Sequence, residues 1–416
     1  MKKIILALVA AINQTYLIEK IRRAWASGSL KEQGFRFIVN QVQRYIATPL
    51  KSSIHFTKNL ELNLVDGFKD HRSSEGFLEI KSDHIARIIK AYKKAKRDQK
   101  NSSPEFVIKG VWDEWISVNY KELIAGLDDE NIELLRKLFN NILREQCTRG
   151  MGSYDEYSRY NSLFGKSYLK IVWIDYYRKL IDIKGEKDIN IPKAGNPSGI
   201  IYKKKLIPIE ALRHAYRAEE IKNIISDLDE KIIVEIGGGY GGLCFQLASK
   251  LQNFKGVKFN LFDIPEVVAI ASSFLMTSLP DKNIRLYGEG KISSDTEGFD
   301  IAIFPHFAID NLNNNSVDIF YNSCSFSEMD ELGSSHYLSV IERCCRKYFM
   351  HDNHDVEFIR RQSDGTFSKN IIGSKLIPNP NFFKLLYKKP RTHGLPEDRA
   401  FKQFEYLYER AVSGAS

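Results

Sequence analysis

The chain has 416 residues, of which 43% are hydrophobic and 27% are charged, and its formal net charge is +9. This composition excludes a disordered chain, and the length suits two domains or one domain with a large extension. The positive charge is dispersed along the sequence, so charge alone does not indicate nucleic-acid binding. Five cysteines form neither a metal-binding spacing nor a disulfide framework, which favours a reducing, cytoplasmic location.

The longest apolar run is Ile4–Ile12, which is too short to span a bilayer. Lys2 and Lys3 precede it as they would a signal-peptide core, but no small-residue cleavage site follows. Leu17–Trp25 continues as a basic amphipathic pattern. We therefore expect an ordinary first helix. Peripheral contact with the inner face of the membrane, or with glycan-assembly machinery, is the alternative.

Residues 1–194 are expected to form a mainly helical domain that serves acceptor binding or oligomerisation, with a homo-oligomer left open. In it, Asp128–Arg144 and Lys166–Ile181 place apolar residues at helical spacing. The lysines of residues 90–100 lie on another predicted helix and are most simply a solvated face. Binding of an anionic glycan, nucleotide sugar or lipid surface is the alternative for these lysines.

Between the two helices, Arg149–Phe164 is rich in glycine, tyrosine, arginine and serine. That composition suits sugar binding by stacking and hydrogen bonding, with Tyr157 and Arg159 as candidates. It suits equally well a connector that is packed by its own tyrosines.

The turn at Gly195–Pro197 marks the start of a second domain, residues 195–416, in which strands and helices alternate. Its first predicted helix, Ile209–Ile225, packs across the start of a sheet. The helix carries Tyr216 and Arg217, which are two further candidates for acceptor binding. Such alternation predicts an α/β, Rossmann-like doubly wound sheet.

The run Glu235–Gly242 lies between two contrasting patterns. Lys231–Ile236 before it is a short β-branched strand, and Leu243–Leu251 after it has leucines four apart, as in an amphipathic helix. The glycines therefore form a strand-to-helix turn. Such a turn lets the backbone approach a ligand and directs the positive end of the helix towards it.

Two cofactors fit a turn of this kind. Gly237, Gly239 and Gly242 have the GxGxxG spacing of dinucleotide-binding folds. Glu235, however, precedes the turn and completes the pattern ExGxGxG with Gly241. A carboxylate would repel a pyrophosphate, whereas it attracts the sulfonium and ammonium groups of S-adenosylmethionine. We predict S-adenosylmethionine as the cofactor, bound at this turn, which also includes Gly238 and Tyr240. A glycine turn without ligand is the alternative.

The next predicted strand, Val257–Phe262, ends in Asp263 and Ile264, and Pro265 begins a further helix. An acid at the tip of the second strand can accept hydrogen bonds from the ribose hydroxyls of an adenosine group. We therefore assign Asp263 and Ile264 to cofactor binding. Capping of the following helix is the alternative role of Asp263.

Further along, Ile284–Tyr287 and Asp300–Phe304 are both short strand candidates, and the pattern does not decide between them for the third strand. Val317–Tyr321 is a clearer strand. It is followed by the polar segment Asn322–Met329, at the edge where open α/β sheets bind ligands.

From Gly195 to about residue 355 the chain resembles the sugar O-methyltransferases of bacterial surface-polysaccharide and antibiotic-sugar pathways. The resemblance rests on five motifs, which are Gly195–Pro197, Leu212–Ile221, Glu235–Gly242, Phe262–Glu266 and Asn322–Met329. It implies a class I methyltransferase fold, with donor binding by Glu235, Gly237, Gly239 and Asp263. It also implies that Ser325, Phe326 and Glu328 line the site, the first two beside the cofactor.

Methyl transfer from sulfonium to oxygen is an in-line displacement, in which a group must accept the proton of the hydroxyl. The best cluster is residues 351–355, directly after the predicted strand Lys347–Met350. We expect His351 or His354 as the base, with Asp352 or Asp355 orienting it. Because alternate residues of an extended chain point to opposite faces, few of them can converge on a metal, and no metal site is expected.

Three other residues are candidates for the base. Glu328 is a carboxylate at the ligand edge, and its alternative role is to cap the next helix. His214 and His306 are held in reserve.

The predicted function is S-adenosylmethionine-dependent methylation of a sugar hydroxyl, in a surface polysaccharide such as O-antigen or capsule, or in its precursor. A sugar or glycan acceptor is therefore expected, and nucleic acid is not. The alternatives are a methyltransferase of nucleic acid or of a small natural product, and a non-catalytic partner in polysaccharide assembly. Asn379–Phe382 superficially matches a base-gripping motif, but it comes too late to follow the fourth strand.

Overall fold

The computed structural model describes residues 60–411 except for 110, 163–164, 186–188, 190, 229–230, 251–256, 291–297, 358, 362–366 and 392–402. The apolar run Ile4–Ile12 and the amphipathic pattern after it lie outside the described residues. Within the described part of the chain, no helix is both long and apolar enough to cross a membrane.

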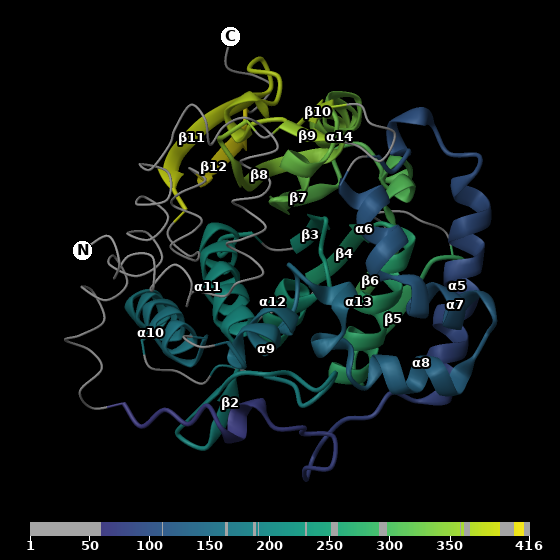
Figure 1. The fold of residues 1–416 in the computed structure, drawn as a ribbon. Coiled ribbons are helices and arrows are strands. Elements are labelled where there is room, and N and C mark those ends of the chain that lie inside the picture. Colours follow the sequence, from purple (N-terminus) through teal and green to yellow (C-terminus); the bar gives the residue numbers. More distant parts are fainter. Residues whose placement is uncertain are drawn as a thin grey trace.

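The first part of the described chain is helical; in Figure 1 the helices of residues 82–139 lie at the right of the view, and the helix of residues 165–184 lies at the left. Its elements are η3 (Asp66–Phe68), α5 (Ser82–Gln99), η4 (Pro104–Phe106), α6 (Val111–Asn119), α7 (Lys121–Asp128), α8 (Ile132–Phe139), η5 (Ile142–Arg144), η6 (Gln146–Thr148), α9 (Tyr154–Tyr160) and α10 (Gly165–Lys184). A small antiparallel hairpin, β1 (Ile200–Tyr202) and β2 (Lys205–Ile207), separates them from the large sheet.

Strands and helices then alternate up to the last part of the chain. They are α11 (Ile209–Ile224), β3 (Lys231–Ile236), α12 (Gly242–Lys250), β4 (Val257–Asp263), α13 (Pro265–Ser278), β5 (Ile284–Leu286), β6 (Ile301–Pro305), η7 (His306–Asn311), β7 (Val317–Ser323), η8 (Ser325–Glu328), α14 (Glu331–Cys344) and β8 (Cys345–His354). Five short or hairpin elements follow, which are β9 (Ile359–Arg361), β10 (Phe367–Lys369), η9 (Gly373–Lys375), β11 (Phe383–Pro390) and β12 (Gln403–Arg410).

The large sheet has eight strands in the order β11-β12-β8-β7-β3-β4-β6-β5. Neighbouring strands from β8 to β5 are parallel, whereas β12 is antiparallel to both β8 and β11. The chain proceeds from β3 outwards through β4 and then returns to β7 on the other side. This confirms the predicted Rossmann-like doubly wound fold and places the topological switch point between β3 and β7. Both undecided strand candidates belong to the sheet, β6 beside β4 and β5 at the edge.

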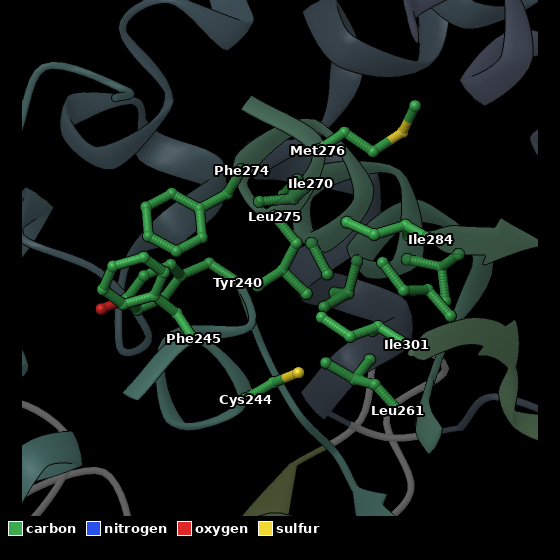
Figure 2. Close-up of a cluster of buried hydrophobic side chains, with 14 of the residues drawn as sticks. Tyr240, Cys244, Phe245, Leu261, Ile270, Phe274, Leu275, Met276, Ile284 and Ile301 are labelled. Atoms are coloured by element: carbon green, nitrogen blue, oxygen red, sulfur yellow. The ribbon is translucent and has the colours of Figure 1, made fainter. Parts of the chain in front are cut away.

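Alternate strand residues face two separate cores. On one face, Ile233 packs with α11, α12, α13 and, from the N-terminal part, α5. Figure 2 shows the part of this cluster around Tyr240, Phe274 and Leu275. On the other face, Val234 packs with α14 and η7. The sheet is therefore buried on both faces, which leaves its strand ends for a ligand.

The lysines of α5 behave as a solvated face with internal partners. Lys94 bonds to Asp98 at 2.6 Å, one turn along the helix. Lys96 reaches 2.7 Å to the buried Glu266 of α13. The Lys96 contact ties α5 to α13, whereas the Lys94 contact lies within the helix.

Candidate active site

The glycine turn after β3 is built for close approach. Gly237, Gly239 and Gly241 have φ values of +73°, +55° and +86°, a region that side chains disfavour. There is also no room for a side chain, since a Cβ at Gly237 would lie 2.3 Å from Ser325 Oγ. The N–H groups of these three glycines are already donated, to the Phe262 carbonyl, the Asp263 carboxylate and the Gly238 carbonyl. The turn therefore offers a ligand close approach to the backbone at the start of α12, a cradle that fits the polar part of a nucleoside-bearing ligand.

Asp263, at the end of β4, is bonded to this turn. One carboxyl oxygen accepts a hydrogen bond from the Gly239 N–H at 2.9 Å, and the other accepts one from the Ile264 N–H at 2.8 Å. The first residue of α13 is Pro265, and no side chain caps this helix. Asp263 therefore does not serve as its cap. Burial raises the pKa of Asp263 to about 7, although both backbone donors lower it.

Glu235 lies next to Asp263, at the adjacent strand end. Its half-buried side chain faces the cavity described below. Burial, and then the charge of Asp263, raise the pKa of Glu235 to about 8. A cation bound between these two carboxyls would favour their charged forms and lower both pKa values.

A cavity of about 610 Å³ opens at this edge of the sheet. Twelve of the candidate residues from the sequence line it, which are Glu235, Gly237, Gly238, Gly239, Tyr240, Asp263, Ile264, Ser325, Glu328, His354, Arg159 and Arg217. Six others lie outside the cavity lining, which are Gly241, Phe326, His351, Asp352, Tyr216 and Tyr157. The cavity therefore unites residues that are far apart in sequence, from α9 to β8.

Two of the residues outside the cavity lining, Gly241 and Phe326, pack behind the cavity wall. A Cβ at Gly241 would lie 2.8 Å from the Leu275 side chain, so this glycine permits the close packing of α13. Phe326 is fully buried in the core, beside Tyr337 and Phe349.

The two outlying tyrosines also have structural partners. Tyr157 lies under the Arg144 guanidinium, 4.9 Å from it, and Tyr216 is buried in the cluster around Trp173.

Four residues of the histidine and aspartate cluster, 351–354, lie within β8 rather than after it, and Asp355 follows the strand outside the cavity lining. His351 is fully buried and stacks on Tyr406 of β12, with ring centroids 4.6 Å apart. Burial lowers the pKa of His351 to about 4. His354, on the other hand, lines the cavity, with its ring 3.0 Å from the Gln403 amide nitrogen. Because strand residues alternate between faces, only part of the cluster reaches the ligand edge.

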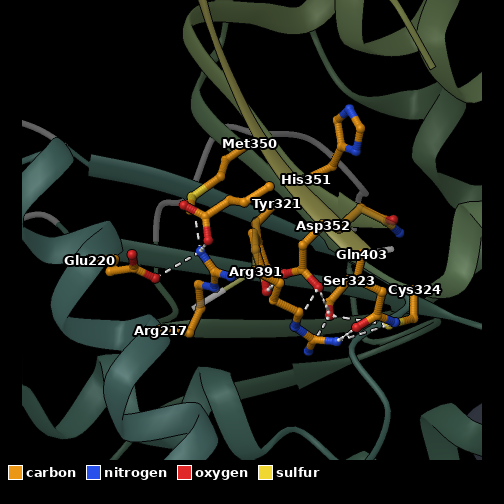
Figure 3. A network of polar contacts seen from close by, with 12 residues as sticks. Arg217, Glu220, Tyr321, Ser323, Cys324, Met350, His351, Asp352, Arg391 and Gln403 are labelled. Carbon is orange, nitrogen blue, oxygen red and sulfur yellow. Dashed lines mark hydrogen bonds and ion pairs between the residues drawn. The ribbon is translucent and has the colours of Figure 1, made fainter. Parts of the chain in front are cut away.

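Asp352 joins a buried network of charges (Figure 3). Its carboxylate contacts Arg217 at 3.0 Å and Arg391 at 3.2 Å, and it accepts hydrogen bonds from the Tyr321 and Ser323 hydroxyls, both at 2.8 Å. Burial would raise the pKa of Asp352, but the two guanidinium groups hold it below its ordinary value. In Figure 3 the His351 ring lies apart from this network.

Arg217 is the centre of that network and is fully buried. It also pairs with Glu220 at 2.9 Å and with Glu405 at 2.7 Å, and Lys389 contacts both of these glutamates. The network ties α11 to β8, β11 and β12, directly beneath the cavity. Arg217 therefore has acidic partners of its own, and part of its surface remains at the cavity wall.

The N-terminal part of the chain closes the cavity with α6. The Trp112 indole donates a hydrogen bond to the Glu328 carboxylate at 2.8 Å, and Trp115 lines the same wall. Arg149 lies 5.3 Å from the Trp115 ring. Glu328 does not cap α14, because Asp330 does so by accepting from the Gly333 N–H at 2.9 Å. Neither tryptophan was singled out from the sequence, where each appears as an ordinary apolar helix residue.

The two reserve histidines also line the cavity. Nε2 of His306 lies 2.8 Å from the Phe106 carbonyl, and burial lowers the pKa of His306 to about 4. Nδ1 of His214 lies 3.2 Å from the Tyr240 hydroxyl. Burial, and then the charges of Arg213 and Arg391, hold the pKa of His214 well below its ordinary value. Within the described residues, no three His, Cys, Asp or Glu side chains are grouped to hold a metal.

No protein-family model and no curated protein matches this chain. Among solved structures, it is similar to an S-adenosylmethionine-dependent methyltransferase from Mesorhizobium loti, with 12% identity, a TM-score of 0.30, and coverage of 47% of this chain and 98% of that one.

The chain is also similar to magnesium protoporphyrin IX methyltransferase with bound SAH from Synechocystis PCC 6803. The identity is 10% and the TM-score is 0.32, and the match covers 59% of this chain and 99% of that one. A third similar structure is phosphoethanolamine N-methyltransferase 2 from Haemonchus contortus. The identity is 11% and the TM-score is 0.31, and the match covers 47% of this chain and 52% of that one. Similarities this weak assign neither a family nor a substrate.

Proposed function

We propose that this chain is an S-adenosylmethionine-dependent O-methyltransferase whose acceptor is a sugar hydroxyl, in a bacterial surface polysaccharide or its precursor. The observation that carries the proposal is that the glycine turn and a wall of aromatic and acidic side chains line one and the same cavity. The donor side is supported by the glycine cradle, by Asp263 at the ribose position and by Glu235 as a counter-charge for cationic groups.

The acceptor side is supported by the chemistry of the opposite wall. Trp112 and Trp115 offer apolar ring surface, against which the C–H face of a sugar can pack. Glu328 and Arg159 offer acceptors and donors for hydroxyl groups. A wall of flat apolar rings edged by charged side chains suits a polyhydroxylated ring better than a purely apolar acceptor.

The methyl donor supplies an electrophilic carbon bound to a positively charged sulfur. The protein then needs to hold the acceptor oxygen in line with that carbon, exclude water and receive a proton. We propose that Glu328 accepts the proton of the acceptor hydroxyl. Glu328 lines the cavity and lies close enough to Asp263 for its charge to raise the pKa of Asp263. The Trp112 N–H fixes the orientation of this carboxylate, and His354 is the second candidate on the same edge.

The proposal is tested by incubating the protein with methyl-labelled donor and separate pools of bacterial glycan, nucleotide sugar and nucleic acid. Label should enter a glycan or nucleotide-sugar pool, and label in nucleic acid alone would contradict the sugar assignment. A calorimetric titration in which no S-adenosylmethionine binds would instead favour the non-catalytic alternative.

The role of Glu328 is tested by the Glu328→Gln variant. It should keep its affinity for the donor and lose on the order of a hundredfold or more in kcat, because glutamine cannot accept the proton. A kcat within a fewfold of wild type would move the assignment to His354.

A further inference from the structure

A pair of carboxyl groups that the proposed mechanism does not use lines the cavity, on the wall formed by α9 and α11. Glu156 belongs to α9 and is only 6% exposed, and Glu210 lies in the first turn of α11. The Oε2 atom of Glu156 is buried and has no hydrogen-bond partner within the described part of the chain. A buried carboxyl without a partner is costly, so its retention at a cavity wall points to a ligand.

The two carboxyls are electrostatically coupled. Burial raises the pKa of Glu156 well above its ordinary value, and the charge of Glu210 raises it further. Glu210 already holds Arg213 at 2.5 Å, so Arg213 is engaged by one carboxylate of the pair. On α9, Asp155 lies 3.8 Å from Arg149, and Arg159 reaches the Tyr168 hydroxyl at 3.3 Å. The nearby cations Arg149, Arg159 and Arg213 thus have other partners, and none of them bonds to Glu156 Oε2.

The pair lies close to the donor turn. Burial raises the pKa of the Tyr240 phenol, and the charges of Glu210, Glu156 and Glu235 all contribute to the rise. Tyr240 belongs to the glycine turn itself, and its hydroxyl contacts His214 on α11. The charges of Glu156 and Glu210 therefore act on the same glycine turn as the charge of Glu235, which the proposed function assigns to donor binding.

On the basis of the proposed function, we propose that Glu156 and Glu210 form a binding site for a protonated amino group inside the cavity. Two molecules can supply this group, namely the amino-acid end of the methyl donor and an amino sugar that serves as the acceptor. In either case the ammonium takes the place of the proton on Glu156, and that proton passes to solvent. The charged and titratable groups around the pair are Asp155, Arg159, Arg213, His214, Glu235 and Tyr240.

The test is calorimetry with wild type, Glu156→Gln and a matched control, Glu219→Gln. Glutamine keeps the size and hydrogen-bonding capacity of Glu156 but cannot become negative, so a site for hydroxyl groups would survive the change. Glu219, on α11, is also a buried glutamate, but it pairs with Lys250 at 2.5 Å and does not line the cavity. Thermal unfolding of each protein confirms that the variants are folded.

Three probes separate the two sources of the amine. S-adenosylhomocysteine carries the amino-acid end, 5′-methylthioadenosine lacks it, and glucosamine with glucose as its control tests the acceptor in the S-adenosylhomocysteine complex. If the pair holds the donor, Glu156→Gln loses on the order of tenfold or more in affinity for S-adenosylhomocysteine and none for methylthioadenosine. If it holds the acceptor, only the preference for glucosamine over glucose is lost.

Wild-type affinities of Glu156→Gln for all these probes would overturn the inference. Failure of the wild-type protein to bind S-adenosylhomocysteine would contradict the proposed function itself. A second readout is the number of protons released on binding, measured near pH 7 in buffers of different ionisation enthalpy. This number should fall in Glu156→Gln and stay unchanged in Glu219→Gln.

Discussion

Replacing Glu235 by glutamine tests whether the carboxyl at the glycine turn has a raised pKa and binds a cation. The pKa of Glu235 is raised from 4.5 to about 8 by burial and then by Asp263. An acid with a higher pKa in the folded state contributes stability that is fully present below its unfolded pKa. This contribution is lost as the pH rises towards the folded pKa. The wild-type protein should therefore become less stable between about pH 5 and about pH 8.

The size of this loss follows from the pKa shift. At about 1.4 kcal/mol per pH unit, three units correspond to at most about 4 kcal/mol, and water in the cavity reduces this value by hydrating the charged carboxylate. The side chain of Glu235→Gln carries no charge at either pH, so the variant should lack the part of the loss that Glu235 contributes. It should therefore gain stability relative to wild type as the pH rises.

The assay is urea unfolding of both proteins at about pH 5 and about pH 8, which gives four free energies of unfolding. The difference between the two pH values removes any packing effect of the substitution that is independent of pH. The variant should also bind S-adenosylmethionine on the order of tenfold or more weakly, because the cationic donor loses a counter-charge. If the two proteins lose stability in parallel between the two pH values, the raised pKa of Glu235 is refuted, and an unchanged affinity of the variant for S-adenosylmethionine would refute its cation-binding role.

Three further changes address the turn, the buried network and the aromatic wall. Gly237→Ala should abolish donor binding in calorimetry, because its Cβ would overlap Ser325, whereas Gly185→Ala, at a similar φ of +72° with open space, should bind normally. Arg217→Met should cost about 3–5 kcal/mol in urea unfolding by leaving buried carboxylates unpaired, and a loss below about 1 kcal/mol would contradict that reasoning. Trp112→Phe should lower sugar methylation at unchanged donor affinity, and unaltered turnover would remove this indole from the acceptor wall.

The donor half of the site was predictable because its information is local. The strand, the turn and the helix from Lys231 to Lys250 follow one another in sequence, and the glycines mark positions of positive φ or of close packing. Asp263 follows by the same logic, one strand later. Hydrophobic periodicity and turn chemistry act over a few residues, so one sequence suffices to place these parts.

The acceptor half depends on contacts between distant segments. Whether His351 reaches the cavity depends on where β8 ends, and the observed strand extends to His354 because β12 pairs along it. Tyr406, which stacks on His351, is supplied by that late strand. Trp112 meets Glu328 across 216 positions of sequence. No local sequence pattern predicts a contact between residues so far apart. The sequence therefore indicated which residue types line the site, but not which residues they contact.

The position of β12 has a consequence for how the molecule is made. The last described strand, Gln403–Arg410, lies inside the sheet between β8 and β11 rather than at its edge. During synthesis, β8 must therefore wait with an open hydrogen-bonding edge until the ribosome has released this segment. Glu405, a partner of Arg217, arrives with it. Nascent chains stalled before residue 403 should accordingly be prone to aggregation and dependent on chaperones, which links synthesis of residues 403–410 to completion of the charge network beneath the cavity.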